Sequence, residues 1–229
     1  MPIVRFRYMK KIGAVLALAL ACAGPALAAK PPKGGKPNSN LTIKASAAAV
    51  TFGRSFALTG TTKNIAAGTT VEVEQNPYPY AGFKPAGKTG VVDPTGGFSI
   101  AGVLPQANTQ YKLVAKASPP VESGTVFVRV GLRVAFKVSD LTPKRGALVR
   151  FSGTVAPAHD GRPVLIQKKT STGYKTVTRT TLLDNGTATS KYSKKVRIRA
   201  TGAYRVVAES VDQDHDNGTS RSRTLRVHG

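Results

Sequence analysis

The chain has 229 residues and carries 34 Lys and Arg against 11 Asp and Glu, which gives a formal net charge of +23. A hydrophobic content of 41% and a charged content of 20% exclude a wholly disordered chain and a polytopic membrane protein. A single cysteine excludes a disulfide scaffold, and the short supply of acids and histidines argues against an enzyme, so we expect no catalytic residues and no cofactor.

Residues 1–28 have the pattern of a secretory signal peptide. Basic residues without any acid come first, an apolar run spans residues 12–23, and an Ala-Leu-Ala site ends at Ala28. The apolar run is shorter than the roughly 20 residues that a membrane-spanning helix needs. Lipoprotein processing at Cys22 is the less favoured alternative. We therefore predict a secreted, extracellular protein. Association of the secreted protein with the cell wall is an additional hypothesis.

Residues 29–40 are rich in Pro, Gly and Lys. Such a segment cannot bury enough apolar surface to offset the entropy lost on ordering, so we interpret it as a flexible basic linker.

Beyond residue 41 the hydrophobic residues alternate with polar ones, which is typical of β-strands. In one example Val149, Phe151 and Val155 alternate with Arg150 and Ser152. No segment has a convincing helical period. Repeated strands separated by Gly, Pro and Asn turns predict an all-β sandwich or barrel.

An internal repeat divides the remainder of the chain into two units. Residues 53–61 read Gly-Arg-Ser-Phe-Ala-Leu-Thr-Gly-Thr, and residues 146–154 read Gly-Ala-Leu-Val-Arg-Phe-Ser-Gly-Thr. Each copy reaches a Tyr-basic-apolar-Val-Ala segment, at Tyr111 and Tyr204, 58 residues after its first glycine. The predicted units are residues 41–131 and residues 132–229.

This pattern resembles the tandem immunoglobulin-like domains of bacterial secreted and cell-surface proteins. The resemblance implies two Greek-key β-sandwiches and covers about residues 41–229. It also implies that Tyr111 and Tyr204 form tyrosine corners, in which the hydroxyl bonds an upstream backbone group. The chain departs from antibody domains because it lacks Trp and a pair of cysteines.

The second unit dominates the charge, because residues 132–229 hold 19 basic and 7 acidic residues. Side chains two apart in a strand point to the same face, so several of these cations could form one basic stripe that attracts a polyanion. An anionic cell-wall polymer is favoured over nucleic acid. The alternative is a solvated face that resists aggregation. The candidate polyanion-binding residues are Lys195, Arg197, Arg199, Arg205, Arg221 and Arg223.

The segment of residues 212–218 carries carboxylates at alternate positions, on Asp212, Asp214 and Asp216. Carboxylate oxygens are the ligands that calcium prefers. The spacing lacks the glycine and glutamate of an EF-hand, and an Asn-Gly pair favours a simple hairpin turn. We therefore predict an acidic hairpin and no metal site, with calcium as the weaker alternative. The histidines lie in predicted turns or at the tail, without the spacing of paired metal ligands.

Tyr78, Tyr80 and Phe83 form an aromatic cluster among prolines. Exposed tyrosines can stack on sugar rings or on a protein partner, whereas the alternative is local packing over an edge strand.

The sequence thus predicts a secreted, non-catalytic binding or adhesion module of the cell surface. Its partner would be an anionic cell-wall polymer, a surface glycan or a protein, with no specific nucleic acid and no membrane span after signal cleavage. The alternatives are a carbohydrate-binding module that uses the aromatic cluster, and a purely structural spacer.

Overall fold

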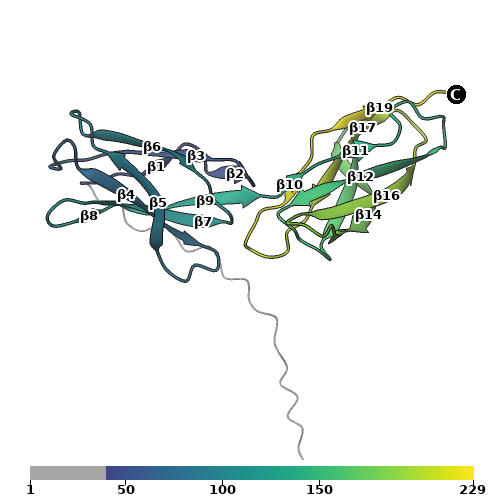
Figure 1. The fold of residues 1–229 in the computed structure, drawn as a ribbon. Coiled ribbons are helices and arrows are strands. Elements are labelled where there is room, and N and C mark those ends of the chain that lie inside the picture. Colours follow the sequence, from purple (N-terminus) through teal and green to yellow (C-terminus); the bar gives the residue numbers. More distant parts are fainter. Residues whose placement is uncertain (1–39) are drawn as a thin grey trace, which may run out of the picture. The chain divides into compact units, whose positions relative to one another are not determined.

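The computed structural model describes residues 40–229, and these residues form an all-β fold (Figure 1). The described part of the chain contains no helix, and therefore none that could cross a lipid bilayer. The all-β class predicted from hydrophobic alternation is confirmed. The predicted signal peptide, Cys22 and residues 29–39 of the predicted linker lie outside the described residues.

The first sandwich has one sheet in the order β1-β3-β6 and another in the order β2-β9-β7-β4-β5, with β8 pairing to β7. All pairs are antiparallel except β2 with β9. Its strands are β1 Lys44–Ala45, β2 Ala49–Thr51, β3 Phe56–Thr61, β4 Thr70–Pro77, β5 Lys84–Val91, β6 Gly97–Val103, β7 Thr109–Ala115, β8 Val121–Glu122 and β9 Val126–Gly131.

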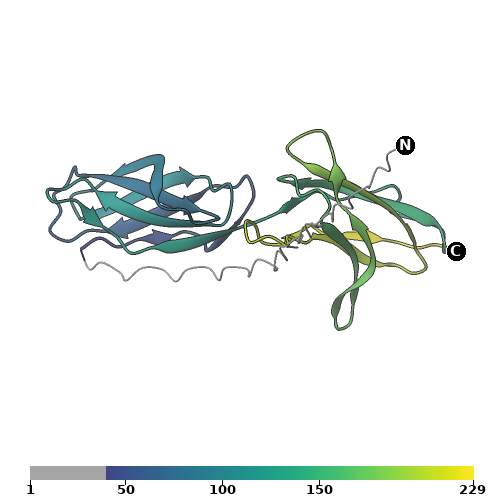
Figure 2. The ribbon, with the colours of Figure 1, turned by 90° about the horizontal axis from the view of Figure 1, so that it is seen from below.

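The second sandwich has one sheet in the order β10-β12-β16-β15, with β11 also on β12, and another in the order β14-β13-β17-β18, with β19 also on β17. Figure 2 shows the strands of each sandwich in two layers. Its strands are β10 Arg133–Val134, β11 Lys137–Val138, β12 Leu148–Ala156, β13 Pro163–Thr170, β14 Gly173–Thr181, β15 Leu183–Asp184, β16 Ser190–Arg197, β17 Gly202–Ala208, β18 Gly218–Thr219 and β19 Arg223–Leu225.

Each sandwich has its own hydrophobic core. The first core is built around Leu58, Val73 and Leu113, and the second around Phe151 and Ile166, all of them buried. These residues occupy alternate positions of their strands, so burying one face of each sheet removes the apolar side chains from water.

The repeated sequence motif places a glycine at the same structural position in both sandwiches. Gly60 is opposite Phe98 in the first sandwich, and Gly153 is opposite Tyr192 in the second. A Cβ atom on Gly60 would lie 2.1 Å from the Thr42 carbonyl oxygen. The repeat therefore preserves a point where a backbone carbonyl of a neighbouring segment lies too close for any side chain.

On Gly153 a Cβ atom would lie 1.9 Å from the carbonyl oxygen of Ala135 and 2.7 Å from the Tyr192 hydroxyl. The missing side chain leaves room for that hydroxyl to donate a 2.7 Å hydrogen bond to the same carbonyl. Burial raises the pKa of Tyr192, as expected for a phenol kept from water.

The prediction that Tyr111 and Tyr204 form tyrosine corners is wrong, because their hydroxyls do not make the expected hydrogen bonds. Tyr111 and Tyr204 are buried, and each packs edge-on against an aromatic ring of its own core, Phe56 or Phe151. Neither hydroxyl bonds an upstream backbone group among the described residues. Burial raises the pKa of Tyr111 to about 12, and the Thr109 hydroxyl offsets part of this effect. The side chains serve as core rings rather than as corner hydrogen-bond donors.

Candidate functional site: a basic sheet face in the second sandwich

Three adjacent strands of the second sandwich present cations on one sheet face. Val149, Phe151 and Val155 of β12 are buried, so the residues between them face outward. The same alternation exposes one side of β11 and β16. We call the outward cations of these strands the basic face, which consists of Lys137, Arg150, Lys191, Lys195 and Arg197.

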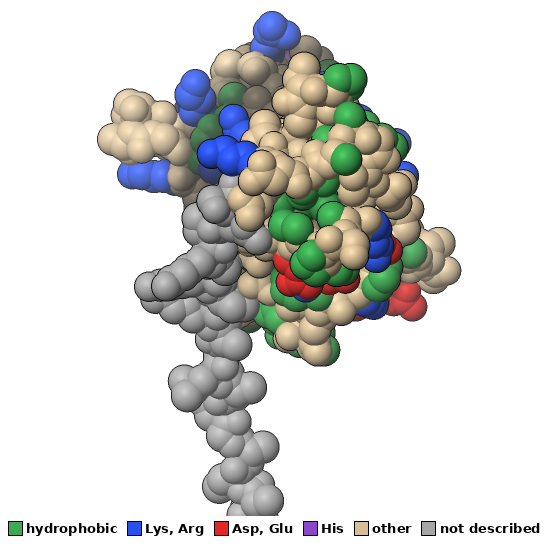
Figure 3. Space-filling view, turned by 90° about the vertical axis from the view of Figure 1, so that its left-hand side faces the viewer, with side chains coloured by type: hydrophobic (Ala, Val, Ile, Leu, Met, Phe, Trp, Pro, Cys, Tyr) green, Lys and Arg blue, Asp and Glu red, His purple; other side chains and the backbone are tan. Residues whose placement is uncertain are grey.

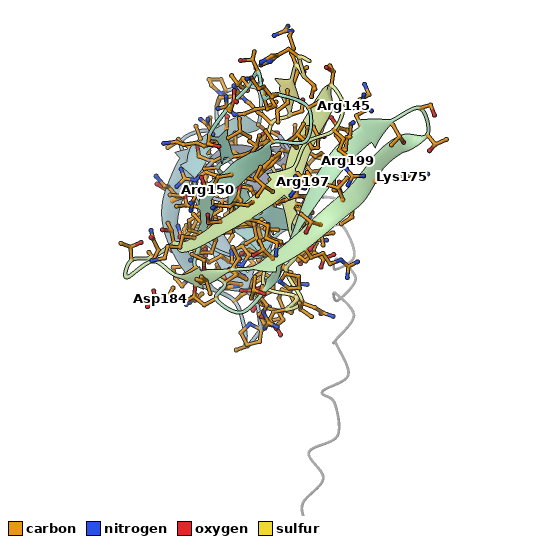
Figure 4. The ribbon with its side chains drawn as sticks, turned by 90° about the vertical axis from the view of Figure 1, so that its right-hand side faces the viewer. Arg145, Arg150, Lys175, Asp184, Arg197 and Arg199 are labelled. Carbon is orange, nitrogen blue, oxygen red and sulfur yellow. The ribbon has the colours of Figure 1, made fainter. Side chains whose placement is uncertain are left out.

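Strand pairing brings these cations close together. Arg150 and Lys195 are direct cross-strand partners, and Arg197 is opposite Leu148. The Nη1 atom of Arg150 donates a 3.3 Å hydrogen bond to the Ser193 hydroxyl. Figure 4 shows Arg150 and Arg197 on this sheet, with Asp184 away from them at its corner.

No acid neutralises the basic face. Strands β11, β12 and β16 contain no Asp or Glu, and none of the five cations forms an ion pair with a described residue. Asp184 on the neighbouring strand β15 accepts a hydrogen bond from the Gly186 amide instead. Figure 3 shows the molecule from the side opposite to Figure 4, and there basic, acidic and hydrophobic side chains are interspersed.

A hollow of about 380 Å³ lies on the basic face. Lys137 and Lys191 line it together with Ser152 and Thr154. A flexible anionic chain could therefore lie against neutral surface while ammonium groups contact its charges.

The predicted basic stripe is wrong as a single surface. Lys195 and Arg197 belong to β16, and Arg199 follows that strand. Arg205 lies on β17 of the opposite sheet, whereas Arg221, after β18, and Arg223, on β19, line one hollow with Lys137 at the edge of the basic face. Consecutive strands β16 and β17 lie in different sheets, so their outward faces point away from each other.

Arg205 and Arg223 are also engaged in local contacts. Arg205 donates a 2.8 Å hydrogen bond from Nε to Gln167 and lies 3.9 Å from the centre of the Tyr174 ring. Arg223 donates a 3.0 Å hydrogen bond to the Phe136 carbonyl. Sequence reasoning missed Lys137, Arg150 and Lys191, although their alternation with buried residues was a signal that could have found them.

The aromatic cluster is less exposed than predicted. Tyr78, Tyr80 and Phe83 are all half-buried. Tyr80 packs edge-on against Tyr78 and Phe127, with ring centres 5.6 and 6.1 Å away. The Lys112 ammonium lies 5.1 Å from the centre of the Phe83 ring. The rings thus contact their own sandwich rather than forming a free flat platform.

The three acidic candidates for calcium do not converge on one point. Asp212 pairs with Arg162, and Asp216 lies 3.5 Å from Arg129. Asp214 instead lies between two histidines, which are close together in space. The three carboxylates have separate partners, so they do not form a calcium site.

The histidine pair was missed because its members lie far apart in sequence. His159 follows β12, and His215 lies in the connection between β17 and β18. Their ring centres are 5.1 Å apart, and both side chains are buried. The sequence spacing considered earlier could not reveal this pair, because it forms only in the folded chain.

The contacts of the acidic segment extend to the first sandwich. Asn108 donates from its amide nitrogen to the Asp214 carbonyl over 2.7 Å and from its side chain to the Gln213 carbonyl over 2.9 Å. Its side-chain oxygen accepts a 2.6 Å hydrogen bond from the Val130 amide. The buried Asn108 side chain thereby satisfies backbone groups on both sides of the junction.

Comparison with known proteins identifies no family for this chain. No protein-family model and no curated protein matches it. One similar solved structure is described as a tetra-tandem repeat in the extending region of a large adhesion protein, with 16% identity and a TM-score of 0.36. The match covers 81% of this chain and 49% of the other, so the chain spans about half the length of that structure.

Proposed function

We propose that this protein is a secreted, non-catalytic module of two immunoglobulin-like sandwiches that binds an anionic polymer of the bacterial cell surface. The signal-peptide pattern of residues 1–28 supports export. The polymer would contact the basic face of the second sandwich.

The uncompensated basic face carries this proposal. Its five cations lie on three adjacent strands that contain no acid. Like charges held side by side raise the local positive potential, and a polyanion relieves their repulsion while releasing its own counterions. A cation that formed an ion pair within the fold would be neutralised by its partner and would attract the polyanion less.

Retention on isolated bacterial cell walls tests the function. We expect sedimentation with the walls at about 50 mM NaCl and release by about 500 mM, because displaced counterions make such binding strongly salt-dependent. Soluble long-chain polyphosphate should compete, since it offers the same repeated negative charge without the sugar of the wall.

Matched charge reversals locate the binding face. The Lys137→Glu and Lys191→Glu double variant changes the basic face, whereas the Lys84→Glu and Lys88→Glu control makes the same change of charge on β5. We expect the first variant to lose retention and the control to keep most of it. Equal loss of retention in both variants would show that binding depends on net charge and not on the basic face. Retention that resists salt would favour the carbohydrate-binding alternative.

A further inference from the structure

Two loops of the second sandwich bring three metal-ligating side chains together. His159, Asp214 and His215 each offer one ligand atom, and these atoms all lie within 4.8 Å of one another. The Asp214 Oδ2 atom lies 3.4 Å from His159 Nε2 and 2.9 Å from His215 Nδ1. The histidine side chains are 6% and 5% exposed, so water solvates these nitrogens poorly.

Hydrogen bonds to backbone carbonyls fix which nitrogen of each ring carries a proton. His159 Nδ1 lies 3.2 Å from the Pro157 carbonyl oxygen, and His215 Nε2 lies 2.9 Å from the Gln106 carbonyl oxygen. A carbonyl oxygen only accepts, so both of these nitrogens donate. In the neutral rings the remaining nitrogens, which face Asp214, hold lone pairs.

The inward nitrogen of His215 is buried and has no hydrogen-bond partner among residues 40–229. Its 2.9 Å approach to Asp214 does not have hydrogen-bond geometry. An unpartnered buried polar atom is costly, and here two lone pairs face a carboxylate oxygen. A cation among these donor atoms would satisfy all of them.

Among residues 40–229, no Lys or Arg forms an ion pair with Asp214. Arg162 is paired with Asp212, and Arg129 lies beside Asp216.

We propose that His159 Nε2, His215 Nδ1 and the Asp214 carboxylate bind a divalent transition-metal ion of the Zn²⁺ type. Two imidazoles and one carboxylate form a donor set that zinc accepts. Tetrahedral Zn²⁺ with bonds of about 2.0–2.1 Å holds its ligand atoms roughly 3.3 Å apart, close to the 3.4 and 2.9 Å that separate the Asp214 oxygen from the two ring nitrogens. The carbonyl acceptors behind both rings orient them as outer-shell partners orient metal-binding histidines.

A cavity adjoins the His215 side of the cluster, although neither His159 nor Asp214 lines it. The cavity, of about 610 Å³, is lined by His215 together with Asp212 and Asp216. The bound metal would join the loop after β12 to the connection between β17 and β18. Through the bond from His215 to Gln106, it would also stiffen the junction with the first sandwich.

Zinc titration of the tag-free full chain, stripped of metal with a chelator, tests the site. We expect one Zn²⁺ per chain by calorimetry and a rise in the thermal midpoint, because the ion binds only the folded chain. The chain has three histidines, so its histidine NMR spectrum is simple. Zn²⁺ should shift the ring signals of His159 and His215 and leave those of His228 in place.

Single substitutions identify the ligands. His159→Gln and His215→Gln should each weaken Zn²⁺ binding by at least about tenfold, whereas His228→Gln, at the exposed tail, should not. Circular dichroism of the metal-free variants separates a lost ligand from a lost fold. If a variant unfolds, the wild-type NMR titration still decides the matter.

Three outcomes would overturn the proposal. The first is the absence of stoichiometric Zn²⁺ binding by the folded wild type. The second is binding that shifts only the His228 ring signals. The third is undiminished Zn²⁺ binding by a folded double variant that lacks both His159 and His215. Each of these outcomes would mean that the cluster is a proton-sharing contact between the histidines and the carboxylate.

Discussion

Arg150 and Lys195 are direct cross-strand partners on the outer face of the second sandwich, so two positive side chains occupy a position where opposite charges would stabilise the sheet. Arg150 is hydrogen-bonded to the Ser193 hydroxyl, and no carboxylate pairs with either cation among residues 40–229. The fold thus tolerates a repulsive pair at the centre of the surface proposed to bind a polyanion.

Neutralising this pair should separate stability from binding. We expect the Arg150→Gln and Lys195→Gln double variant to be as stable as the wild type or more stable by roughly 0.2–1 kcal/mol at low salt, because the repulsion is removed. Its affinity for polyphosphate should fall. Urea unfolding and a binding titration measure the two effects, and Lys84→Gln with Lys88→Gln is the control. Reduced stability with unchanged affinity would contradict the prediction.

Closing the space at Gly153 should destabilise the second sandwich. Gly153→Ala forces a methyl group against the Ala135 carbonyl, at a cost of about 1–3 kcal/mol, and disturbs the Tyr192 hydrogen bond. Tyr192→Phe removes that bond alone and should cost about 1 kcal/mol. Because both changes affect one contact, the double variant should lose less than the sum of the two. Additive losses in urea unfolding would show that the contacts are independent.

Acid should weaken the turn that precedes β6. The Thr95 hydroxyl and then the Gly97 amide donate to the Asp93 carboxylate and hold its pKa below the ordinary value. A lowered folded-state pKa means that the stabilisation is present above about pH 4 and is lost as the pH falls through the folded pKa.

The Asp93→Asn variant keeps an acceptor oxygen but does not titrate. Its thermal midpoint should therefore fall less than that of the wild type between about pH 6 and about pH 2. Asp184→Asn, at the exposed end of strand β15, controls for the loss of one carboxylate. If the thermal midpoints of the wild type and of Asp93→Asn fell in parallel with pH, the Asp93 carboxylate would not contribute the expected stability.

Truncating the aromatic cluster should affect folding more than retention on the wall. Tyr80→Ala removes a half-buried ring from its contacts with Tyr78 and Phe127, which we expect to cost roughly 1–3 kcal/mol. Salt-sensitive retention on cell walls should persist in this variant under native conditions. Loss of a salt-resistant polysaccharide contact in folded Tyr80→Ala would instead support sugar stacking.

Local alternation was sufficient to predict the all-β class. Buried Val149, Phe151 and Val155 occupy the alternate positions expected from sequence, because a pleated strand sends successive side chains to opposite faces. The repeated Gly-Thr ending of the motif also has a structural cause, since Gly60 and Gly153 both lie under a close backbone carbonyl.

Contacts between distant segments could not be predicted in the same way. The chain crosses between sheets after β16, so Arg197 and Arg205 face different directions although they are only eight residues apart. His159 and His215 meet because two loops converge at one end of the sandwich, and no local period encodes that meeting. The tyrosine corners failed for a different reason, because both rings are buried against core aromatics, Tyr111 against Phe56 and Tyr204 against Phe151.

The glycines at positions 60 and 153 allow the two halves of the protein to be perturbed separately. A methyl group at one position would loosen only the sandwich that contains it, since each glycine closely approaches only residues of its own sandwich, Thr42 and Phe98 for Gly60 and Ala135 and Tyr192 for Gly153. The intact half would then serve as an internal reference within the same molecule. Unfolding of either half could be followed without cutting the chain.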